Sequence, residues 1–432
     1  MKRTIFRQTP SSLLATAVAV AISAPASAYN LHSEDGTELN FDLEVIVGYF
    51  SSEESYGNPD SDPSWTEGYA KYGFSGTQAI GKGELFGAAN VLTSGTRGDG
   101  DAAGLTIGDE SETDFEDLYL GYRTGMFELS AGRQNLTIGD GFILNGDALN
   151  MGEGLDGIAP VSMDRGGAYW LAARKAFDQT AVLRFGGDKG LRSDLFWFES
   201  DNPAQASVEM AGINAEYVTD KGTYGLMYLE GLDVNDTEAG FWGYEGRDGQ
   251  KTTSIRYQGN AGVENLFLAA EYVDQSQGNS APDANAWHAE AGWTFADTPW
   301  SPSVNYRYTS YDSGYDPLFF GFNRGYGTWF QGEVAANYAG PFGTDADIHY
   351  LGVKANPTEL LTVGTSYFDF SNTVGGSGDN DAREIDIWAE WVAMDHLIIS
   401  PLVGFYTPDS ASSIQGNDDT NVYAQLIAIV PF

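Results

Sequence analysis

Short segments in which hydrophobic and polar side chains alternate recur along most of the chain. In the first of them, Phe41, Leu43 and Val45 stand between Asn40, Asp42 and Glu44. Because successive side chains of a β-strand point to opposite faces, this pattern predicts a strand with one apolar and one polar face. The same alternation returns at residues 70–75, 117–123, 254–258, 304–309, 330–338 and 384–391.

These segments have the length of strands that cross a lipid bilayer, which takes about 9–11 residues when the strand is tilted. Polar or Gly-rich connections separate them roughly every twenty residues, as in outer-membrane barrels. Aromatic residues such as Tyr49, Trp293 and Tyr367 stand near segment ends, where membrane interfaces favour them. We predict an all-β fold, a single transmembrane antiparallel β-barrel with an apolar outside and a wet inside. When marginal candidates near residues 185–198 are merged, the barrel has about 18 strands, with a range of roughly 16–20.

Long and short connections alternate at both ends of the predicted barrel. The short turns at 124–125 and 356–358 are expected on the periplasmic side. Long extracellular loops are predicted at 51–64, 94–113, 135–166 and 371–382. In the middle of the chain the alternation is strained, because 231–250 and 313–327 are both long and would fall on the periplasmic side. Either a strand is miscounted there, or a periplasmic segment folds back toward the pore.

A soluble β-sandwich would also alternate, but a chain of this length would need two or three such domains. We see no linkers between domains and no convincing helical periodicity after the first 28 residues. The final segment, Asn421–Phe432, alternates again and predicts a closing strand, since a barrel in lipid cannot leave a strand edge unpaired. A terminal Phe resembles the signal read by the barrel insertion machinery of the outer membrane.

The first 28 residues predict a signal peptide. Lys2, Arg3 and Arg7 form a basic region, residues 13–24 an apolar core, and residues 26–28 an A-x-A cleavage site. The apolar core is too short to span a bilayer, and no later stretch approaches the ~20 apolar residues of a membrane helix. We therefore predict an exported protein with a signal peptide at 1–28 and a barrel at 29–432.

The chain has no Cys and a formal net charge of -39, which becomes -42 without the three basic residues of the leader. Such acidity argues against nucleic-acid binding, which needs a basic surface. Acidic pairs in the predicted loops lack the twelve-residue spacing of a calcium loop, so we expect solvated acidic surface, with divalent cations as potential partners. These pairs are Asp99 and Asp101, Asp109 and Glu110, Asp379 and Asp381, and Asp418 and Asp419.

Charged residues on the polar faces of the strands are expected to line the pore, because a charge on the lipid side at mid-bilayer costs ~2–4 kcal/mol. The predicted pore-lining bases are Lys71, Lys82, Arg123, Arg184, Arg256 and Arg307. Acids of the same parity outnumber them and include Asp117, Glu271, Glu333 and Asp386. Two interpretations stay open: a ring of bases that lowers the entry barrier for anions, or bases that only pair with luminal acids in a mixed pore.

Three motifs resemble the alginate-export family of outer-membrane barrels. They are Ala131–Gln134 followed by Ile138–Gly141, Tyr315–Phe319 leading into Gly325–Glu333, and Asn356–Leu360 before a strand that ends at Tyr367–Phe370. The resemblance implies an 18-stranded channel with a basic lumen that passes an acidic polysaccharide. Only Arg133 is carried over as a pore residue. Its parity places it on the outer face with Leu129 and Ala131, so the strand must bulge or end before it.

An enzyme is not expected. His288 with Glu290, and His349 with Asp347, share strand faces, but no nucleophile or metal-binding motif accompanies them. We predict no catalytic residue, no metal site and no cofactor.

The predicted function is a channel in the bacterial outer membrane that passes hydrophilic anionic solutes or an acidic polysaccharide. Its expected partners are outer-membrane lipids, the barrel insertion machinery and the solute. The alternatives are a general or mixed-selectivity diffusion porin and a non-conducting adhesin or receptor barrel.

Overall fold

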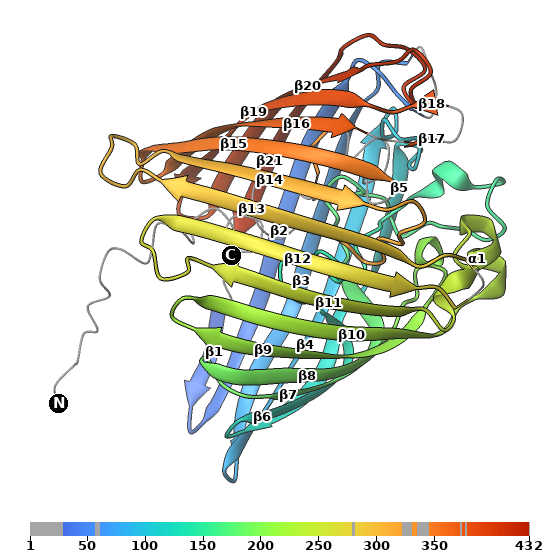
Figure 1. Cartoon of the computed structure of the whole chain (residues 1–432). Coiled ribbons are helices and arrows are strands. Elements are labelled where there is room, and N and C mark those ends of the chain that lie inside the picture. The colour runs from blue at the N-terminus through green and yellow to red at the C-terminus, as the bar shows by residue number, and fades with distance from the viewer. Residues whose placement is uncertain are drawn as a thin grey trace.

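The computed structural model describes residues 29–56, 61–278, 281–321, 331–334, 345–371, 374–375 and 378–431. The predicted signal peptide and Phe432 lie outside these ranges. Eighteen antiparallel strands formed by the described residues close into a barrel (Figure 1), which confirms the predicted fold class and strand number.

The barrel strands follow one another around the wall in chain order. Their bounds are β2 (Thr37–Ser52), β3 (Ser64–Ile80), β4 (Gly83–Gly98), β5 (Asp109–Thr124), β6 (Phe127–Asn135), β7 (Ala176–Phe185), β8 (Gly190–Glu199), β9 (Glu209–Thr219), β10 (Gly222–Asp233), β11 (Lys251–Gly259), β12 (Leu266–Ser276), β13 (Ala284–Thr294), β14 (Ser303–Tyr311), β15 (Ala346–Thr358), β16 (Leu361–Ser371), β19 (Ala382–Met394), β20 (Leu397–Pro408) and β21 (Asn421–Pro431).

The wall closes where β21 pairs with β2 from Glu44 to Ser52. The remaining edge of β2 is covered by the short N-terminal strand β1 (Tyr29–Glu34), which pairs with residues 37–41. The closing strand predicted from the final alternation is therefore present. The connections hold a two-residue hairpin, β17 (Val374–Gly375) with β18 (Gly378–Asp379), the helix α1 (Asp236–Trp242) and three 3-10 turns, η2 (Glu153–Leu155), η3 (Pro203–Gln205) and η4 (Glu245–Arg247).

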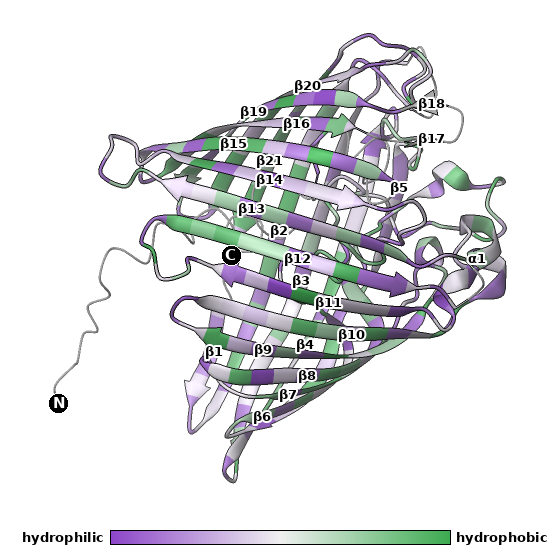
Figure 2. Ribbon diagram, in the orientation of Figure 1, coloured by the Kyte–Doolittle hydropathy of each residue, from purple (hydrophilic) through white to green (hydrophobic). Residues whose placement is uncertain are grey.

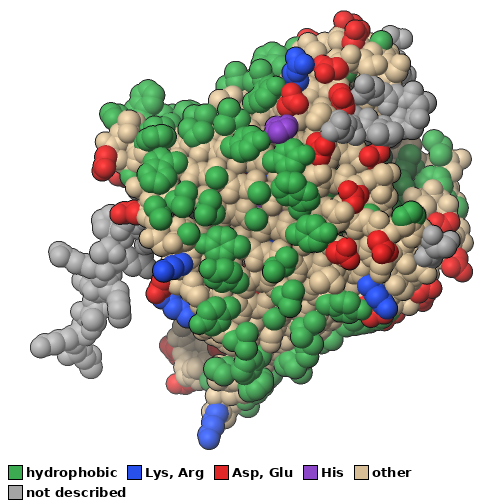
Figure 3. Space-filling model, in the orientation of Figure 1, with side chains coloured by type: hydrophobic (Ala, Val, Ile, Leu, Met, Phe, Trp, Pro, Cys, Tyr) green, Lys and Arg blue, Asp and Glu red, His purple; other side chains and the backbone are tan. Residues whose placement is uncertain are grey.

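The outer face of the wall is apolar. In β10, Leu226 is exposed while Gly225 and Met227 on either side are buried, and the neighbouring strands repeat this alternation. Hydrophobic side chains form a broad area on the outside, and charged ones gather mainly toward its rims (Figure 3). None of the helices in the described ranges is long and apolar enough to span a bilayer.

Connections at one end of the wall are generally longer than those at the other, although the turn 295–302 has eight residues and the loop 277–283 has seven. Residues 234–250 and 313–321 lie at the end with the long loops, the end that carries α1 in Figure 1, which corrects the periplasmic side expected for 231–250 and for the described part of 313–327. The region 185–198, where candidates were merged, holds the turn 186–189 between β7 and β8. Two further bounds differ, because the loop predicted at 94–113 is only 99–108 and the loop predicted at 135–166 is 136–175.

The inside of the barrel is not uniformly wet, which corrects the predicted polar interior. At the loop end the connection 136–175 and the described part of 312–345 are largely buried. Phe177 of β7 and Phe198 of β8 point inward there, with ring centroids 4.2 Å apart, and Phe319 packs against both. Residues 331–334 also contradict the strand predicted at 330–338, since they form bends rather than part of the wall. The ribbon coloured by hydropathy shows hydrophobic and hydrophilic positions interspersed along the strands (Figure 2).

Candidate functional site

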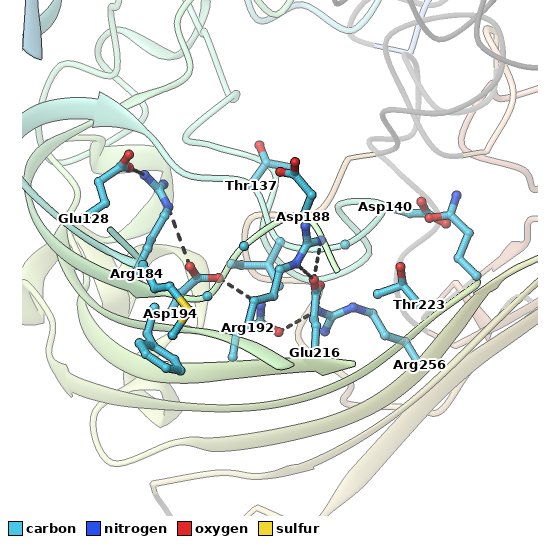
Figure 4. Close-up of a pocket in the computed structure, with 18 of the residues that line it drawn as sticks. Glu128, Thr137, Asp140, Arg184, Asp188, Arg192, Asp194, Glu216, Thr223 and Arg256 are labelled. Carbon is cyan, nitrogen blue, oxygen red and sulfur yellow. Dashed lines mark hydrogen bonds and ion pairs between the residues drawn. The ribbon is translucent and has the colours of Figure 1, made fainter. Parts of the chain in front are cut away.

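A cavity of about 510 Å³ lies inside the barrel, between the wall formed by β6–β13 and the inserted loop 136–175. The loop contributes Thr137–Asp140, and the wall contributes most of the charged side chains. Figure 4 shows Arg184, Arg192 and Arg256 converging on acids of neighbouring strands. We call this cavity the arginine chamber.

Each of these arginines is paired with a carboxylate across the sheet. The Arg184 guanidinium lies 2.7 Å from Glu128 and 3.6 Å from Asp194. Arg192 and Arg256 both bind Glu216 of β9. Arg192 lies directly opposite Glu216 on the neighbouring strand β8, and Arg256 lies two strands away on β11. The mixed-pore interpretation expected this pairing of luminal bases with luminal acids. Because paired charges differ in exposure, the number of basic and acidic residues alone does not describe the surface that a solute meets.

Exposure separates the two signs of charge in the chamber. The side chains of Arg184 and Arg192 are 40% and 46% exposed, whereas Glu216 is 6% exposed. Glu128 and Asp194, the partners of Arg184, are 25% and 21% exposed. The side chains of Arg184 and Arg192 are therefore more exposed than those of their carboxylate partners. Arg256 is 8% exposed, and Asp188 in the turn 186–189 is an exposed acid at the cavity.

The other predicted bases are spread around the wall. Lys71 lies 3.7 Å from Asp117, Arg123 lies 2.7 Å from Glu84, and Arg307 lies 3.6 Å from Glu290. Only Arg123 borders the chamber, since Arg307 is 4% exposed behind the inserted segments. Lys82 differs from the prediction, because it lies in the turn between β3 and β4 and not on the wall.

Arg133 lies opposite a bulge in β7. The pairing of β6 with β7 shifts register between Gly132 and Gln134, and Gly132 has a φ of 123°. Two residues of β7, Asp178 and Gln179, oppose the single residue Arg133, whose side chain is buried. The guanidinium binds Asp178 at 2.8 Å and Asp201 at 2.7 Å. Arg133 thus holds the base of the inserted loop and does not border the arginine chamber.

A second buried arginine, Arg165, also holds the inserted loop 136–175 in place through ion pairs. Arg165 lies 3.2 Å from both Asp201 and Asp147, and Asp147 is fully buried. Removing one partner of a buried ion pair leaves an uncompensated charge and costs about 3–5 kcal/mol. We expect Arg165→Met to loosen loop 136–175 and to speed its cleavage by proteinase K. The matched change Arg383→Met, at a 61% exposed arginine on the outer face, should leave cleavage unchanged; equal rates in both variants would contradict this role of Arg165.

The predicted acids have two kinds of surroundings. Asp117 faces Lys71 and accepts a hydrogen bond from Asn90, and Glu271 borders the chamber at 4% exposure. Glu333 and Asp386 lie in a separate, deeply buried group with Glu384. The Glu384 carboxylate accepts hydrogen bonds from the backbone N–H groups of Glu333 and Val334, so it anchors the described part of the second inserted loop to β19.

Arg192 and the anchoring carboxylates were missed by the sequence reasoning. Arg192 and Asp194 alternate with Leu191 and Leu195, a signal that was lost when residues near 185–198 were merged. Glu116 accepts hydrogen bonds from the backbone N–H groups of Lys175 and Ala176, and Glu67 accepts one from Leu171. No local pattern marks an inward carboxylate as an anchor, because its partner lies over 50 residues away.

Asp101 organises the loop 99–108 and makes it sensitive to pH. Its carboxylate accepts hydrogen bonds from the backbone N–H groups of Ala103 and Leu105, and burial raises its pKa to about 6. A pKa raised on folding means that protonation favours the folded loop, so stability is gained as pH falls through 6 toward 4. We expect slower amide exchange at Ala103 and Leu105 at pH 5 than at pH 7.5, after correction for intrinsic rates. Asp101→Asn should remove the pH dependence of amide exchange at Ala103 and Leu105. If that pH dependence survived in the variant, a group other than Asp101 would cause it.

A closed antiparallel wall with an apolar outside and a charged chamber inside defines a bacterial outer-membrane β-barrel of the channel class. The chain belongs to the alginate export family, whose sequence profile matches residues 88–317. This confirms the family that the motifs suggested. Of those motifs, Gly325–Phe330 lies outside the described residues.

Solved structures of similar fold are outer-membrane porins. OccK5 (OpdH) of Pseudomonas aeruginosa is 12% identical, with 91% of this chain and 98% of that chain covered and a TM-score of 0.60. A BenF-like porin from Pseudomonas fluorescens Pf-5 is 11% identical, with coverage of 91% and 98% and a TM-score of 0.61. OprD of Pseudomonas aeruginosa is 13% identical, with coverage of 94% and 95% and a TM-score of 0.58. No functionally curated protein matches the sequence significantly.

Proposed function

We propose that the protein is a channel that passes hydrophilic anions, with an acidic polysaccharide or its fragments as the preferred class. One observation carries this proposal: in the arginine chamber the side chains of Arg184 and Arg192 are more exposed than those of Glu128, Asp194 and Glu216, the acids that pair with them. Cations that line a narrow, water-filled passage lower the entry barrier for anions. Membership of the alginate export family supports the same class of solute.

The geometry suits a carboxylate-bearing chain. A guanidinium presents planar N–H donors that match a carboxylate. The adjacent strands β7 and β8 carry Arg184 and Arg192, with Asp194 directly opposite Arg184. Both arginines keep a protein carboxylate as partner, so a passing carboxylate must compete with it. Competition of this kind keeps binding weak, and weak binding at several sites is what conduction requires.

Orientation and partners follow from the same proposal. The end with the long loops faces the cell exterior, the short turns face the periplasm, and outer-membrane lipids cover the apolar face. Insertion would use the general barrel machinery, which reads a C-terminal strand such as β21. The chamber's charges would guide solutes and not catalyse a reaction, in line with His288, which is 2% exposed and packs edge-on against Phe142. Divalent cations at the acidic loops remain a sequence-based proposal, since the described residues contain no group of three or more candidate ligands.

A swelling assay on liposomes that contain the refolded protein tests the proposal. Galacturonate, galactose and galactosamine have similar size and carry negative, zero and positive charge. We expect galacturonate to enter fastest and galactosamine slowest, and the order should flatten at high salt because charges are screened. Faster entry of galactosamine than of galacturonate would contradict an anion channel.

Two alternatives each have an observation in their favour. The chamber is lined by four arginines and six acids, which favours a mixed-selectivity diffusion porin; equal entry of the three sugars would support it. The apolar packing at the loop end favours a non-conducting adhesin or receptor barrel. Absence of swelling with every sugar, from protein shown to be folded, would support that reading.

A further inference from the structure

A second cavity, of about 720 Å³, lies at the loop end of the barrel. It is separated from the arginine chamber by two inserted segments that hydrogen-bond to each other. The backbone N–H of Asn145 donates to the Phe319 carbonyl at 2.8 Å, and the N–H of Phe319 donates to the Ile143 carbonyl at 3.1 Å. A third bond runs from Gly321 to Gly141 at 2.9 Å. We call these segments, 141–145 and 318–321, the partition, and the second cavity the outer cavity.

The lining of the outer cavity differs in kind from that of the arginine chamber. Aromatic rings come from several separate loops, and aliphatic side chains fill the spaces between them. The rings belong to Tyr56, Tyr169, Trp242, Tyr244, Tyr315, Phe319 and Phe320. Rings of this kind offer large contact faces to a flat ligand, and stacked or edge-to-face pairs are favourable beyond the area they bury.

The charged groups at the outer cavity are already satisfied. Arg247 donates two hydrogen bonds to Asp316 at 2.7 and 2.8 Å and a third to the Gln205 carbonyl, and its guanidinium lies 3.7 Å from the ring of Tyr244. The indole N–H of Trp242 donates to the Pro203 carbonyl at 3.1 Å. An ionic ligand would therefore find no open partner among these groups. The cavity favours an uncharged ligand.

We propose that the outer cavity is a binding site for a small, uncharged aromatic molecule, of which a phenol is a simple example. Its volume lies within the range of about 300–1,000 Å³ typical of small-molecule sites. The ring of the ligand packs among the aromatic side chains that line the cavity. The site is distinct from the arginine chamber, and this inference does not depend on which ions the channel passes.

Binding can be measured by 19F NMR on the whole mature barrel in lipid nanodiscs, with empty nanodiscs as the baseline for partition into lipid. The probes are 4-fluorophenol and 2-fluoro-2-deoxyglucose, which separate an aromatic site from a sugar site. We expect saturable binding of 4-fluorophenol and none of the fluorosugar. Binding of the fluorosugar instead, or a phenol signal no larger than that of empty nanodiscs, would overturn the proposal.

Two variants locate the binding. Phe320→Ala removes a ring and Ala103→Trp fills the cavity, so each should weaken 4-fluorophenol binding at least tenfold. The matched control is Phe241→Ala, which removes the ring next to Trp242 on α1 from outside the cavity. Unchanged affinity in both variants, with the barrel folded, would place the phenol elsewhere and overturn the assignment.

Discussion

Replacing Arg184 and Arg192 together by glutamine is expected to reverse the ion preference of the channel from anions to cations. Both guanidinium groups belong to the accessible surface of the arginine chamber. Without them, Glu128, Asp194 and Glu216 would carry charge that only Arg256 still offsets. The change removes two positive charges and uncovers negative ones in the same narrow space, so the effect exceeds that of a single surface substitution.

The ratio of chloride to potassium permeability measures this effect. We expect the ratio to fall by at least a factor of ten and to pass below one. The matched control is Arg97→Gln, which makes the same chemical change at a 58% exposed arginine at the loop end of β4, outside the chamber. A ratio that falls equally in the control would show that overall charge, and not the chamber, sets the preference.

Opening the partition is expected to raise conductance several-fold. The ring of Phe319 packs on Phe177 and Phe198, and that of Phe142 on His288 and Tyr311, so these two rings fill the boundary between the two cavities. Apolar constrictions hinder ions because water leaves them. In the double variant Phe142→Ala and Phe319→Ala, water would enter the gap and join the cavities.

Single-channel recording measures the change, and the folded barrel is checked by its heat-dependent migration in gel electrophoresis. Truncating a buried Phe costs about 3–5 kcal/mol, so this check is essential. The control variant Phe41→Ala with Phe74→Ala removes a ring pair, 5.7 Å apart, from the outer face of β2 and β3. It should leave conductance unchanged. Unaltered conductance in the partition variant would mean that ions take another path through the barrel.

The strands of the barrel wall were predictable because the alternation of apolar and polar residues that marks each strand is a local feature of the sequence. Each strand repeats a two-residue period, as in β10, where Leu226 and Tyr228 face outward, and the bilayer fixes the length of the segment. The same alternation predicted an irregular strand near Arg133, because its guanidinium could not reach the lumen from the outward parity of a regular strand. The irregularity is the register shift against β7, whose extra residue lies in β7.

The filling of the barrel was not predictable in the same way. Phe142 and Phe319 lie in irregular segments without a period, and these segments hydrogen-bond to each other only because both loops fold inward. The pairing of Arg192 with Glu216 depends on the register of β8 and β9, which no local pattern gives. Parity gives the face of the strand on which a side chain lies but not how exposed that side chain is. Exposure distinguishes Arg184 and Arg192 from the less exposed acids that pair with them.

The reversal potential of the unmodified protein in a planar bilayer, under a tenfold KCl gradient, tests the anion preference most directly. Exposed guanidinium groups in the arginine chamber predict a potential of the sign set by chloride, with a magnitude that shrinks as salt screens the charges. A potential of the sign set by potassium would contradict the proposed anion channel.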